Sequence, residues 1–468
     1  FLQLSWTGVP TTDNAGLYET WFTDDNGKVS VSLTTHGETM HTRKWMPCFD
    51  EPLFKVPLKL WIEHPSHLTA LSNGRLLSID KTSTRWMSSF EKTWPVPSYL
   101  YAFSVTDYVG NASDVDGLPV SVFVPSPLSF LLPRIMKDVK ESIKISLPRF
   151  NAVHLNSKLD FVFFPDHTSA MENPGHISLA TEFHDKKATL VHEMMHQYFG
   201  NLVTLEWWSD LWINEGLANY YEDLALAGNN TKSLLLALRH LRDSSLDDDV
   251  FDTSLPLHNK VHTFIDSRLM FRNPYTKGAM VMNMLRDFVG KEEFDDVNEK
   301  LLNERTNSTL SLQQFYSYLS TTRSAQNAVN IARDFLEQAG YPLLVIRRVK
   351  GSTRIRQVRF HRGFVNEMQR DFDTRWTIPI YLTTLDGRYS RTVVMQREEI
   401  EVPHSEFLIV DPNRIVNYRV IYDENYYEEI RGSAMREEDK DLMELDLLEA
   451  ASMGYADIVT AYYTIMRR

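Results

Sequence analysis

Hydrophobic and polar residues alternate in several stretches of the first 115 residues. Residues 29–33 alternate, and residues 54–61 alternate around Pro57, which favours an edge strand because proline has no backbone N–H to donate. Residues 99–105 are a third stretch, rich in aromatic and β-branched side chains. The pattern predicts a β-rich N-terminal domain over residues 1–115.

The hydrophobic period changes between residues 116 and 342. Two short apolar stretches, 119–124 and 159–164, predict strands. Hydrophobic residues then recur every three or four positions, which predicts helices over 186–199, 212–227, 231–244, 275–289 and 326–339. Gly340 and Pro342 end the last helix. A small sheet followed by helices is typical of an α+β domain.

The pattern of the remaining residues predicts strands again and then helices. Strands are expected over 343–349, 353–360, 376–384 and 391–395, which together predict a small β-sandwich over residues 343–422. Residues 423–468 are rich in Glu, Asp, Leu and Ala, and their charges are expected on the solvated face of helices. The sequence therefore predicts an α+β multidomain chain divided into residues 1–115, 116–342, 343–422 and 423–468.

Composition narrows the class of protein. Its 468 residues are 43% hydrophobic and 24% charged, as in a soluble globular protein. The net charge of −13 argues against a nucleic-acid partner, which would need a basic surface. No apolar run reaches the length of about 18 residues that a membrane span requires. The chain starts at Phe1 without an initiator Met, so we expect a fragment, with any membrane anchor upstream.

Candidate chemistry begins with the segment His192-Glu193-Met194-Met195-His196. Two histidines four residues apart lie on one face of a helix, where both imidazoles can bind one zinc ion. Glu215, 19 residues after His196, offers a third ligand. Two His and one Glu leave the fourth position open, as in a catalytic zinc site. Glu193 then lies beside the ion, where it can act as general base and acid.

These segments resemble the aminopeptidase N family of zinc metallopeptidases, the gluzincin aminopeptidases. Residues 191–204 and 206–220 look like its zinc-binding block. Residues 47–52 resemble its N-domain signature, 169–173 its exopeptidase motif and 273–278 the segment with its catalytic tyrosine. The resemblance covers nearly the whole chain. It implies the later part of an N-terminal β-domain, a thermolysin-like catalytic domain, a β-sandwich and the beginning of a truncated helical domain.

The resemblance also implies an activity and the residues that carry it. The family uses one zinc ion to hydrolyse the N-terminal residue from peptides with a free amino end. Tyr275 matches the tyrosine that stabilises the oxyanion. Glu172, Glu222 and Glu38 are expected to bind the substrate amine, since crowded carboxylates favour a cation. Ser169, Ala170 and Met171 are expected to line the substrate backbone. Asp210 is a candidate to orient a zinc ligand.

Two departures from the family pattern leave other functions open. Ser169 replaces a Gly at which the family's backbone approaches the substrate closely. Pro174 replaces the usual Trp, as in the leukotriene hydrolase branch, but the β-rich segment 343–422 argues against that branch. An endopeptidase and a catalytically weak binding homologue are further alternatives. The latter is disfavoured because the zinc ligands and Glu193 are all present.

Cellular location is the least constrained property. The single cysteine, Cys48, weakly favours a reducing compartment. Three glycosylation sequons, at Asn111, Asn229 and Asn307, are no more than chance would give. The resemblance favours the extracellular face of the plasma membrane, and a cytoplasmic location stays open. Peptides are the expected partners, and both a homodimer and a membrane anchor outside this chain stay open.

Overall fold

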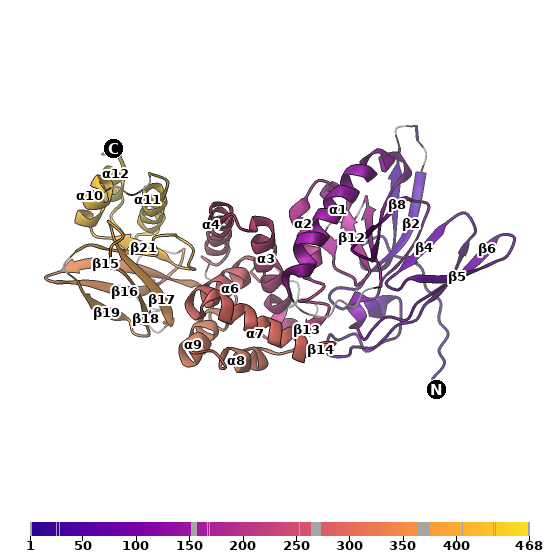
Figure 1. The fold of residues 1–468 in the computed structure, drawn as a ribbon, viewed down its shortest axis with the longest axis horizontal. Helices are drawn as coiled ribbons and strands as arrows, with labels where there is room; N and C mark the ends of the chain where they lie inside the picture. The colour runs from indigo at the N-terminus through magenta and orange to yellow at the C-terminus, as the bar shows by residue number, and fades with distance from the viewer. Residues whose placement is uncertain are drawn as a thin grey trace. The chain divides into compact units, whose positions relative to one another are not determined.

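The computed structural model describes residues 2–24, 26–27, 29–150, 157–165, 167, 169–251, 253–263, 273–362, 374–404, 406–433, 435 and 437–466. The chain forms two compact units. The first contains residues 1–228, 261–268 and 299–311, and the second contains 229–260, 269–298 and 312–468. Figure 1 labels many of the helices and strands of the two units, which are described separately below.

The first unit begins with two small antiparallel sheets. One has the order β1-β2-β7-β4, with β1 at Gly16–Thr23, β2 at Val29–His36, β4 at Thr69–Ser72 and β7 at Phe103–Thr106. The other has the order β3-β6-β5, with β3 at Trp61–Pro65, β5 at Leu76–Lys81 and β6 at Arg85–Phe90. Ala70, Phe90 and Val105 form the core between them because alternate side chains of each strand point inward.

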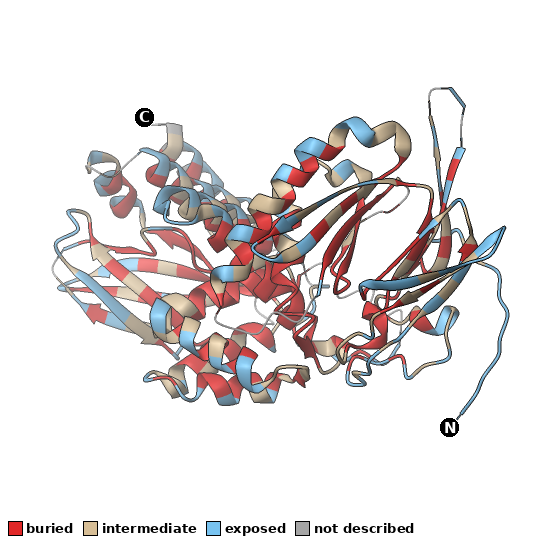
Figure 2. Ribbon diagram, turned by 45° about the vertical axis from the view of Figure 1, so that its right-hand side comes forward, coloured by how far each residue is buried: buried red, intermediate tan, exposed pale blue. Residues whose placement is uncertain are grey.

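A five-stranded sheet forms the centre of the first unit. Its order is β11-β12-β10-β9-β8, with β8 at Val109–Val115, β9 at Leu118–Val124, β10 at Leu159–Phe164, β11 at Ala170–Met171 and β12 at His176–Ala180. β10 lies parallel to both β9 and β12. All six of its residues are buried, as expected of a central strand with both faces covered. Figure 2 shows buried residues concentrated on the strands of this sheet.

The two faces of β10 pack against different parts of the first unit. Phe161 and Phe163 belong to the core formed with α1 (Leu132–Ser146) and α2 (Lys187–Met195). Val162 and Phe164 pack with Leu71 on the opposite face. The unit also contains α3 (Leu211–Ala227) and the parallel pair β13 (Val203–Leu205) and β14 (Ser308–Leu310). The sheet thus supports α2, the helix with the paired histidines.

The second unit combines helices with two sheets. Its helices are α4 (Thr231–Asp248), α6 (Thr276–Val289), α8 (Leu312–Leu319), α9 (Ala325–Leu336), α10 (Glu424–Gly432), α11 (Glu437–Ser452) and α12 (Ile458–Met466), and α7 spans Lys291–Glu304. One sheet has the order β19-β16-β15-β21: Glu399–Pro403, Ser352–Phe360, Tyr341–Val349 and Arg419–Tyr422. The other is β18-β17-β20: Ser390–Met395, Ile378–Thr384 and Leu408–Val410. Figure 1 shows α10, α11 and α12 next to these sheets.

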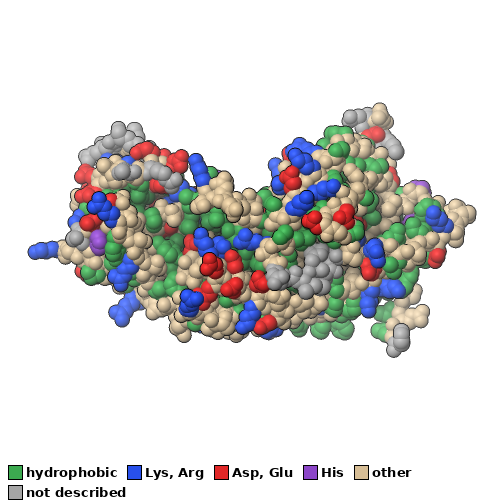
Figure 3. Space-filling model, viewed as in Figure 1, with side chains coloured by type: hydrophobic (Ala, Val, Ile, Leu, Met, Phe, Trp, Pro, Cys, Tyr) green, Lys and Arg blue, Asp and Glu red, His purple; other side chains and the backbone are tan. Residues whose placement is uncertain are grey.

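The predicted fold class, an α+β multidomain chain with a β-rich beginning, a sheet with helices, a β-sandwich and final helices, is confirmed. The domain boundaries stay predictions, and the one expected after residue 115 falls in the turn between the paired strands β8 and β9. Among the helices that the structure describes, none has the length and apolar character needed to cross a bilayer. On the face shown in Figure 3, acidic and basic side chains are interspersed.

Two strand predictions are wrong in part. Residues 54–60 form an isolated bridge, Val56 with Val96, and β3 begins only at Trp61. Pro57 removes one backbone donor, so a regular ladder cannot form there. Tyr99 and Leu100 lie in the 3-10 helix η2 (Ser98–Leu100), and β7 begins at Phe103. The hydroxyl of Ser98 donates to Asp50 over 2.7 Å, a tertiary contact that overrides the local preference.

The expectation of solvated charges on the final helices is also wrong in part. Asp446 of α11 is buried at 1% exposure. Its carboxylate accepts hydrogen bonds from Arg242 at 3.0 Å and Arg419 at 3.1 Å, and it pairs with the buried Arg414. It also accepts from the backbone N–H of Val420 at 2.9 Å. The carboxylate can be buried because it is paired with guanidinium groups and fully hydrogen-bonded.

Substitution of Asp446 should destabilise the second unit. Asp446→Ala leaves three buried guanidinium groups without their shared counter-charge, so we expect a loss of about 3–5 kcal/mol in the free energy of unfolding. Urea denaturation measures this loss. Glu437→Ala on the same helix is the control. Its side chain is 76% exposed and pairs with Lys440, so the expected loss is at most about 1 kcal/mol. Equal effects of both substitutions would contradict this account.

Candidate active site

The paired histidines lie at the end of α2. His192 is in its last turn and His196 is the residue that caps it, with a backbone hydrogen bond of 3.1 Å from His196 N–H to the His192 carbonyl. Their Nε2 atoms face each other at 2.9 Å. Leu190, Val191, Met194 and Met195 are buried around them, so the helix is fixed on all sides. The predicted helical spacing thus brings both imidazoles together.

Glu215 of α3 completes a group of three ligand atoms. Its Oε2 lies 3.5 Å from Nε2 of His192 and 3.3 Å from Nε2 of His196. Tetrahedral zinc with bonds of about 2.0–2.1 Å places its ligand atoms about 3.3 Å apart. The three observed separations bracket that value, so the residues fit zinc. A second group, Glu172, Glu193 and His196, also has ligand atoms within 4.8 Å of one another.

Each imidazole is oriented through its other nitrogen. Nδ1 of His196 donates to the backbone carbonyl of Phe199 at 2.9 Å, because a carbonyl can only accept. Nδ1 of His192 lies 3.1 Å from Oε2 of Glu222. Both contacts leave Nε2 for a metal ion, as is typical of histidine ligands. Glu222 therefore makes the contact of a carboxylate that orients a ligand, and its contact with the substrate amine stays a prediction.

Three further carboxylates surround the imidazoles. Glu193 and Glu172 are each 4% exposed, and Oε2 of Glu193 and Oε1 of Glu172 lack a hydrogen-bond partner among the described residues. Burial raises the pKa of Glu193 to about 8, although His196 and His192 lower it. Burial also raises the pKa of Glu38, and the carboxylates of Glu172, Glu215 and Glu193 raise it further. The half-buried Glu38 therefore lies within electrostatic range of the other three carboxylates.

The cluster has more carboxyl groups than imidazoles. Burial opposes protonation of His196, but Glu215 and Glu172 outweigh it and raise its pKa to about 9. Burial opposes ionisation of Glu215, but His196 and His192 outweigh it and lower its pKa to about 2. Even with both imidazoles protonated, the surrounding carboxylates outnumber them. A buried site of this kind favours a cation.

The exopeptidase motif is held against α2 and the loop after it. The backbone carbonyl of Glu172 accepts hydrogen bonds from Asn201 Nδ2 at 2.8 Å and Gln197 Nε2 at 3.3 Å. Ala170 and Met171 form β11, the edge strand of the central sheet. The carbonyl of Ser169 accepts from the N–H of Ala180 at 3.0 Å. The motif therefore places Glu172 in the cluster of carboxylates and the edge strand β11 next to Glu172.

Tyr99 is a site residue that the sequence did not indicate. Its side chain is 1% exposed, and its hydroxyl accepts a hydrogen bond of 3.1 Å from Nδ2 of Asn214, next to the ligand Glu215. Burial raises the pKa of Tyr99 well above its usual value, and Glu172 and Glu38 raise it further. Tyr99 therefore lies beside the carboxylates. Its only sequence signal was a place in a stretch that looked like a strand.

Lys55 is a second residue that the sequence analysis missed. Its ammonium group donates to the carbonyls of Asn201, Leu202 and Ser308, each at 3.0 Å. All three donors of the lysine are therefore used on two backbone segments. Lys55 lies shortly after the Pro47–Pro52 motif in the sequence. Its ammonium group fixes the loop that follows α2.

Tyr275 and Asp210 are the two remaining candidates from the sequence. Tyr275 belongs to the second unit, where it is the half-buried residue that precedes α6, and its role stays a prediction. Asp210 is buried at the start of α3. The role of Asp210 in orienting a zinc ligand stays a prediction, and Glu222, which contacts His192, is a second candidate for that role.

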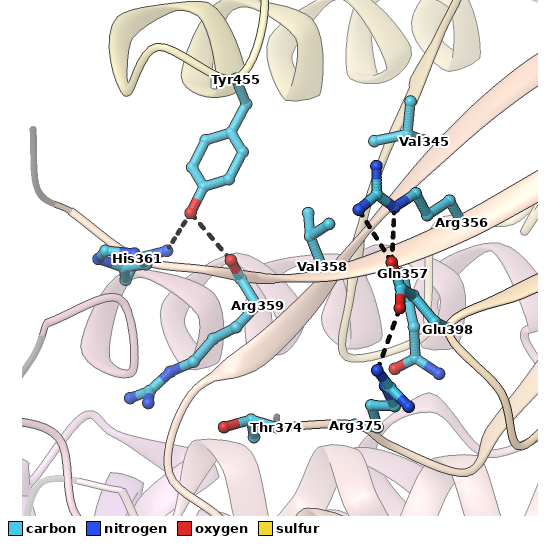
Figure 4. Close-up of a pocket in the computed structure, with 10 residues that line it drawn as sticks. All are labelled: Val345, Arg356, Gln357, Val358, Arg359, His361, Thr374, Arg375, Glu398 and Tyr455. Carbon is cyan, nitrogen blue, oxygen red and sulfur yellow. Dashed lines mark hydrogen bonds and ion pairs between the residues drawn. The ribbon is translucent and has the colours of Figure 1, made fainter. Parts of the chain in front are cut away.

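A cavity of about 260 Å³ lies in the second unit, on β16 (Figure 4). Val345 and Val358 form part of its wall, and Arg356 and Arg375 both pair with Glu398, at 2.9 and 3.0 Å. The cavity thus has apolar walls with arginine–glutamate pairs at its edge. None of the residues lining it is a predicted catalytic residue.

Two models of one protein family match parts of this chain. Residues 135–335 match the family model "Peptidase family M1 domain", and residues 2–100 match "Peptidase M1 N-terminal domain". The first match includes the zinc-binding segment, the exopeptidase motif and Tyr275. The second includes Glu38, Lys55 and Tyr99. The matches therefore contain every candidate site residue.

Similar curated proteins are aminopeptidases. Glutamyl aminopeptidase of Homo sapiens is 29% identical over 451 residues, 90% of this chain and 46% of that protein. Endoplasmic reticulum aminopeptidase 2 of Bos taurus is 30% identical over 84% of this chain and 46% of its own length. Aminopeptidase N of Rattus norvegicus is 28% identical over 91% of this chain and 48% of its own length. The chain thus spans about half the length of these relatives.

Removal of Glu222 should weaken zinc binding. Glu222→Ala takes the acceptor from Nδ1 of His192, so we expect zinc affinity to fall about 10- to 100-fold. Competition with a fluorescent chelator measures this affinity. Glu222→Gln keeps an oxygen acceptor and should retain most of the affinity. If Glu222→Ala left zinc affinity unchanged and raised KM only for peptides with a free amine, the amine role predicted from sequence would hold instead.

Gly200 should be required for the same affinity. Its φ of +122° is one that side chains rarely adopt, and an added Cβ would lie 3.1 Å from Nδ1 of His196. Gly200→Ala should therefore displace the imidazole and lower zinc affinity by about tenfold or more. Gly290→Ala is the control, because Gly290 has φ of +108° but no atom near its Cβ position. Equal zinc affinities of the two variants would show that the contact with His196 is unimportant.

Proposed function

Because the chain belongs to peptidase family M1, we propose that it acts as a zinc-dependent aminopeptidase that hydrolyses the N-terminal residue from peptides with a free amino end. One observation carries this proposal. His192, His196 and Glu215 present three ligand atoms at zinc spacing inside a buried excess of carboxylates. The aminopeptidase relatives support the same activity.

The ligand set suits one zinc ion. His192, His196 and Glu215 would hold it, and Glu222 and the Phe199 carbonyl would keep both Nε2 atoms available. When bound, zinc would supply a Lewis acid and an activated water at neutral pH. Glu193 accepts a proton from the attacking water at its carboxylate and passes it to the departing amine.

The carboxylates beyond the ligands select for a free amine. Glu172 and Glu38 are proposed to bind the substrate α-ammonium group, which would offset part of the buried negative charge. This group exists only at the start of a peptide, so its binding limits cleavage to one residue at a time. Ser169, Ala170 and Met171 are proposed to pair with the substrate backbone along the edge of β11. Tyr275 is proposed to donate to the developing oxyanion, a role that rests on its motif.

A location outside the cytosol is the accompanying proposal. Asn229, in one of the three sequons, is exposed between α3 and α4, where a glycan would have room. The membrane anchor and the homodimer stay predictions. The proposed location is independent of the proposed activity.

The activity is tested with one peptide in free and N-acetylated forms. We expect stepwise loss of N-terminal residues from the free form alone, because acetylation removes the ammonium group that Glu172 and Glu38 would bind. A zinc chelator should abolish the cleavage. Mass spectrometry follows the products. Cleavage of both forms would indicate an endopeptidase, and cleavage of neither by zinc-loaded protein would indicate a binding homologue.

Glu193→Gln is the matched control for this experiment. The amide has the size of the carboxylate but cannot accept the proton, so kcat should fall about 10²- to 10⁴-fold while zinc content is retained. If the purified variant kept full activity, contamination by another peptidase or a different general base would explain the cleavage.

A further inference from the structure

A buried carboxylate in the second unit contacts the residues on both sides of Tyr275. Asn273 precedes Tyr275 by two residues, and its Nδ2 donates to Oδ1 of Asp249 over 3.2 Å. Lys277 follows Tyr275 by two residues, and its Nζ forms an ion pair of 2.7 Å with Oδ2 of Asp249. The motif Asn273-Pro274-Tyr275-Thr276-Lys277 is therefore held at both ends by one side chain.

This contact is completely shielded from water. The side chains of Lys277 and Asp249 both have 0% exposure. Lys277 also donates to the carbonyls of Gln338 at 3.0 Å and Gly340 at 3.2 Å, so its ammonium group has three partners. A buried charge with a full set of partners holds one geometry, because any displacement leaves a charge or a donor uncompensated.

The ion pair of Asp249 and Lys277 joins three segments that are distant in the sequence. Its backbone N–H donates to the Ser245 carbonyl over 3.2 Å, which fixes it at the end of α4. Lys277 lies in the first turn of α6, where its N–H donates to the carbonyl of Asn273 over 3.2 Å. Gln338 and Gly340 lie between α9 and β15. The turn that contains Tyr275 is therefore anchored to the core of its unit.

We propose that Asp249 is a positioning residue for Tyr275. Through Asn273 and Lys277 it fixes the backbone on both sides of the tyrosine and so the direction of the hydroxyl. Two apolar residues could fill the same space without burying charges, but they would not fix both flanks of one residue. This inference rests on the proposed role of Tyr275 in stabilising the oxyanion. A donor displaced by about 1 Å loses much of its effect on the transition state.

A double-mutant cycle tests the proposal. Tyr275→Phe should lower kcat about 10²- to 10³-fold with little change in KM. Asp249→Asn should lower kcat about tenfold or more in the zinc-loaded protein that retains Tyr275, also with little change in KM. In the Tyr275→Phe background, Asp249→Asn should change kcat less than about twofold, because the residue through which it acts is already lost. Zinc content and the unfolding midpoint are measured for every variant.

Asp446→Asn is the matched control. It makes the same chemical change at another buried ion pair of the same unit, so any loss of kcat should be equal in both backgrounds. If Asp249→Asn behaved like this control, with equal losses in both backgrounds, Asp249 would be only structural and the proposal would be wrong. If Tyr275→Phe left kcat unchanged, the proposed role of Tyr275 would fail, and the positioning role with it.

A milder substitution keeps the test decisive if Asp249→Asn does not fold. Asn273→Ala removes one hydrogen bond of 3.2 Å and leaves the ion pair intact. It should lower kcat several-fold when Tyr275 is present and less than about twofold in the Tyr275→Phe background. Equal losses in both backgrounds would overturn the proposal here as well.

Discussion

The candidate active site depends on one electrostatic constraint: several carboxylates are buried around two imidazoles. Glu172, Glu193 and Glu215 are almost fully buried, and the pKa of half-buried Glu38 is raised by all three. Such a group is unfavourable unless cations neutralise it. A metal ion at the histidines and an ammonium group at Glu172 and Glu38 are two cations that these positions suit. The same cluster of carboxylates is thus the physical basis of both proposals, the bound metal ion and the choice of a free amine.

The rest of the first unit holds these groups in place. The central sheet supports α2 through Phe161 and Phe163. Asn201 and Gln197, which follow the second histidine, bind the carbonyl of Glu172 and so join the exopeptidase motif to the zinc-binding helix. Lys55 then fixes the loop that contains Asn201. The Pro47–Pro52 motif supports the site indirectly. Its Asp50 accepts a hydrogen bond from Ser98, the neighbour of Tyr99.

Local patterns in the sequence predicted what depends on local geometry. The spacing of His192 and His196 fixes both on one helical face, and residues 159–164, apolar except for Asp160, indicate a buried strand. Long-range contacts could not be predicted from these local patterns. Residues 99–105 look like a strand, but Asp50 holds Ser98 in a 3-10 helix. Asp446 looks solvated, but its arginine partners lie 27, 32 and 204 residues away and cannot be paired with it from periodicity. The contact of Glu222 with His192 is of the same kind, because α2 and α3 meet only in the folded chain.

The position of the metal ion tests the central claim most directly. Crystals of the zinc-loaded protein should give a single anomalous peak at the zinc absorption edge, bounded by Nε2 of His192, Nε2 of His196 and the carboxylate of Glu215. A peak among Glu172, Glu193 and His196 would contradict the account, because it would remove Glu193 as a general base. The absence of any peak at these residues would contradict it as well.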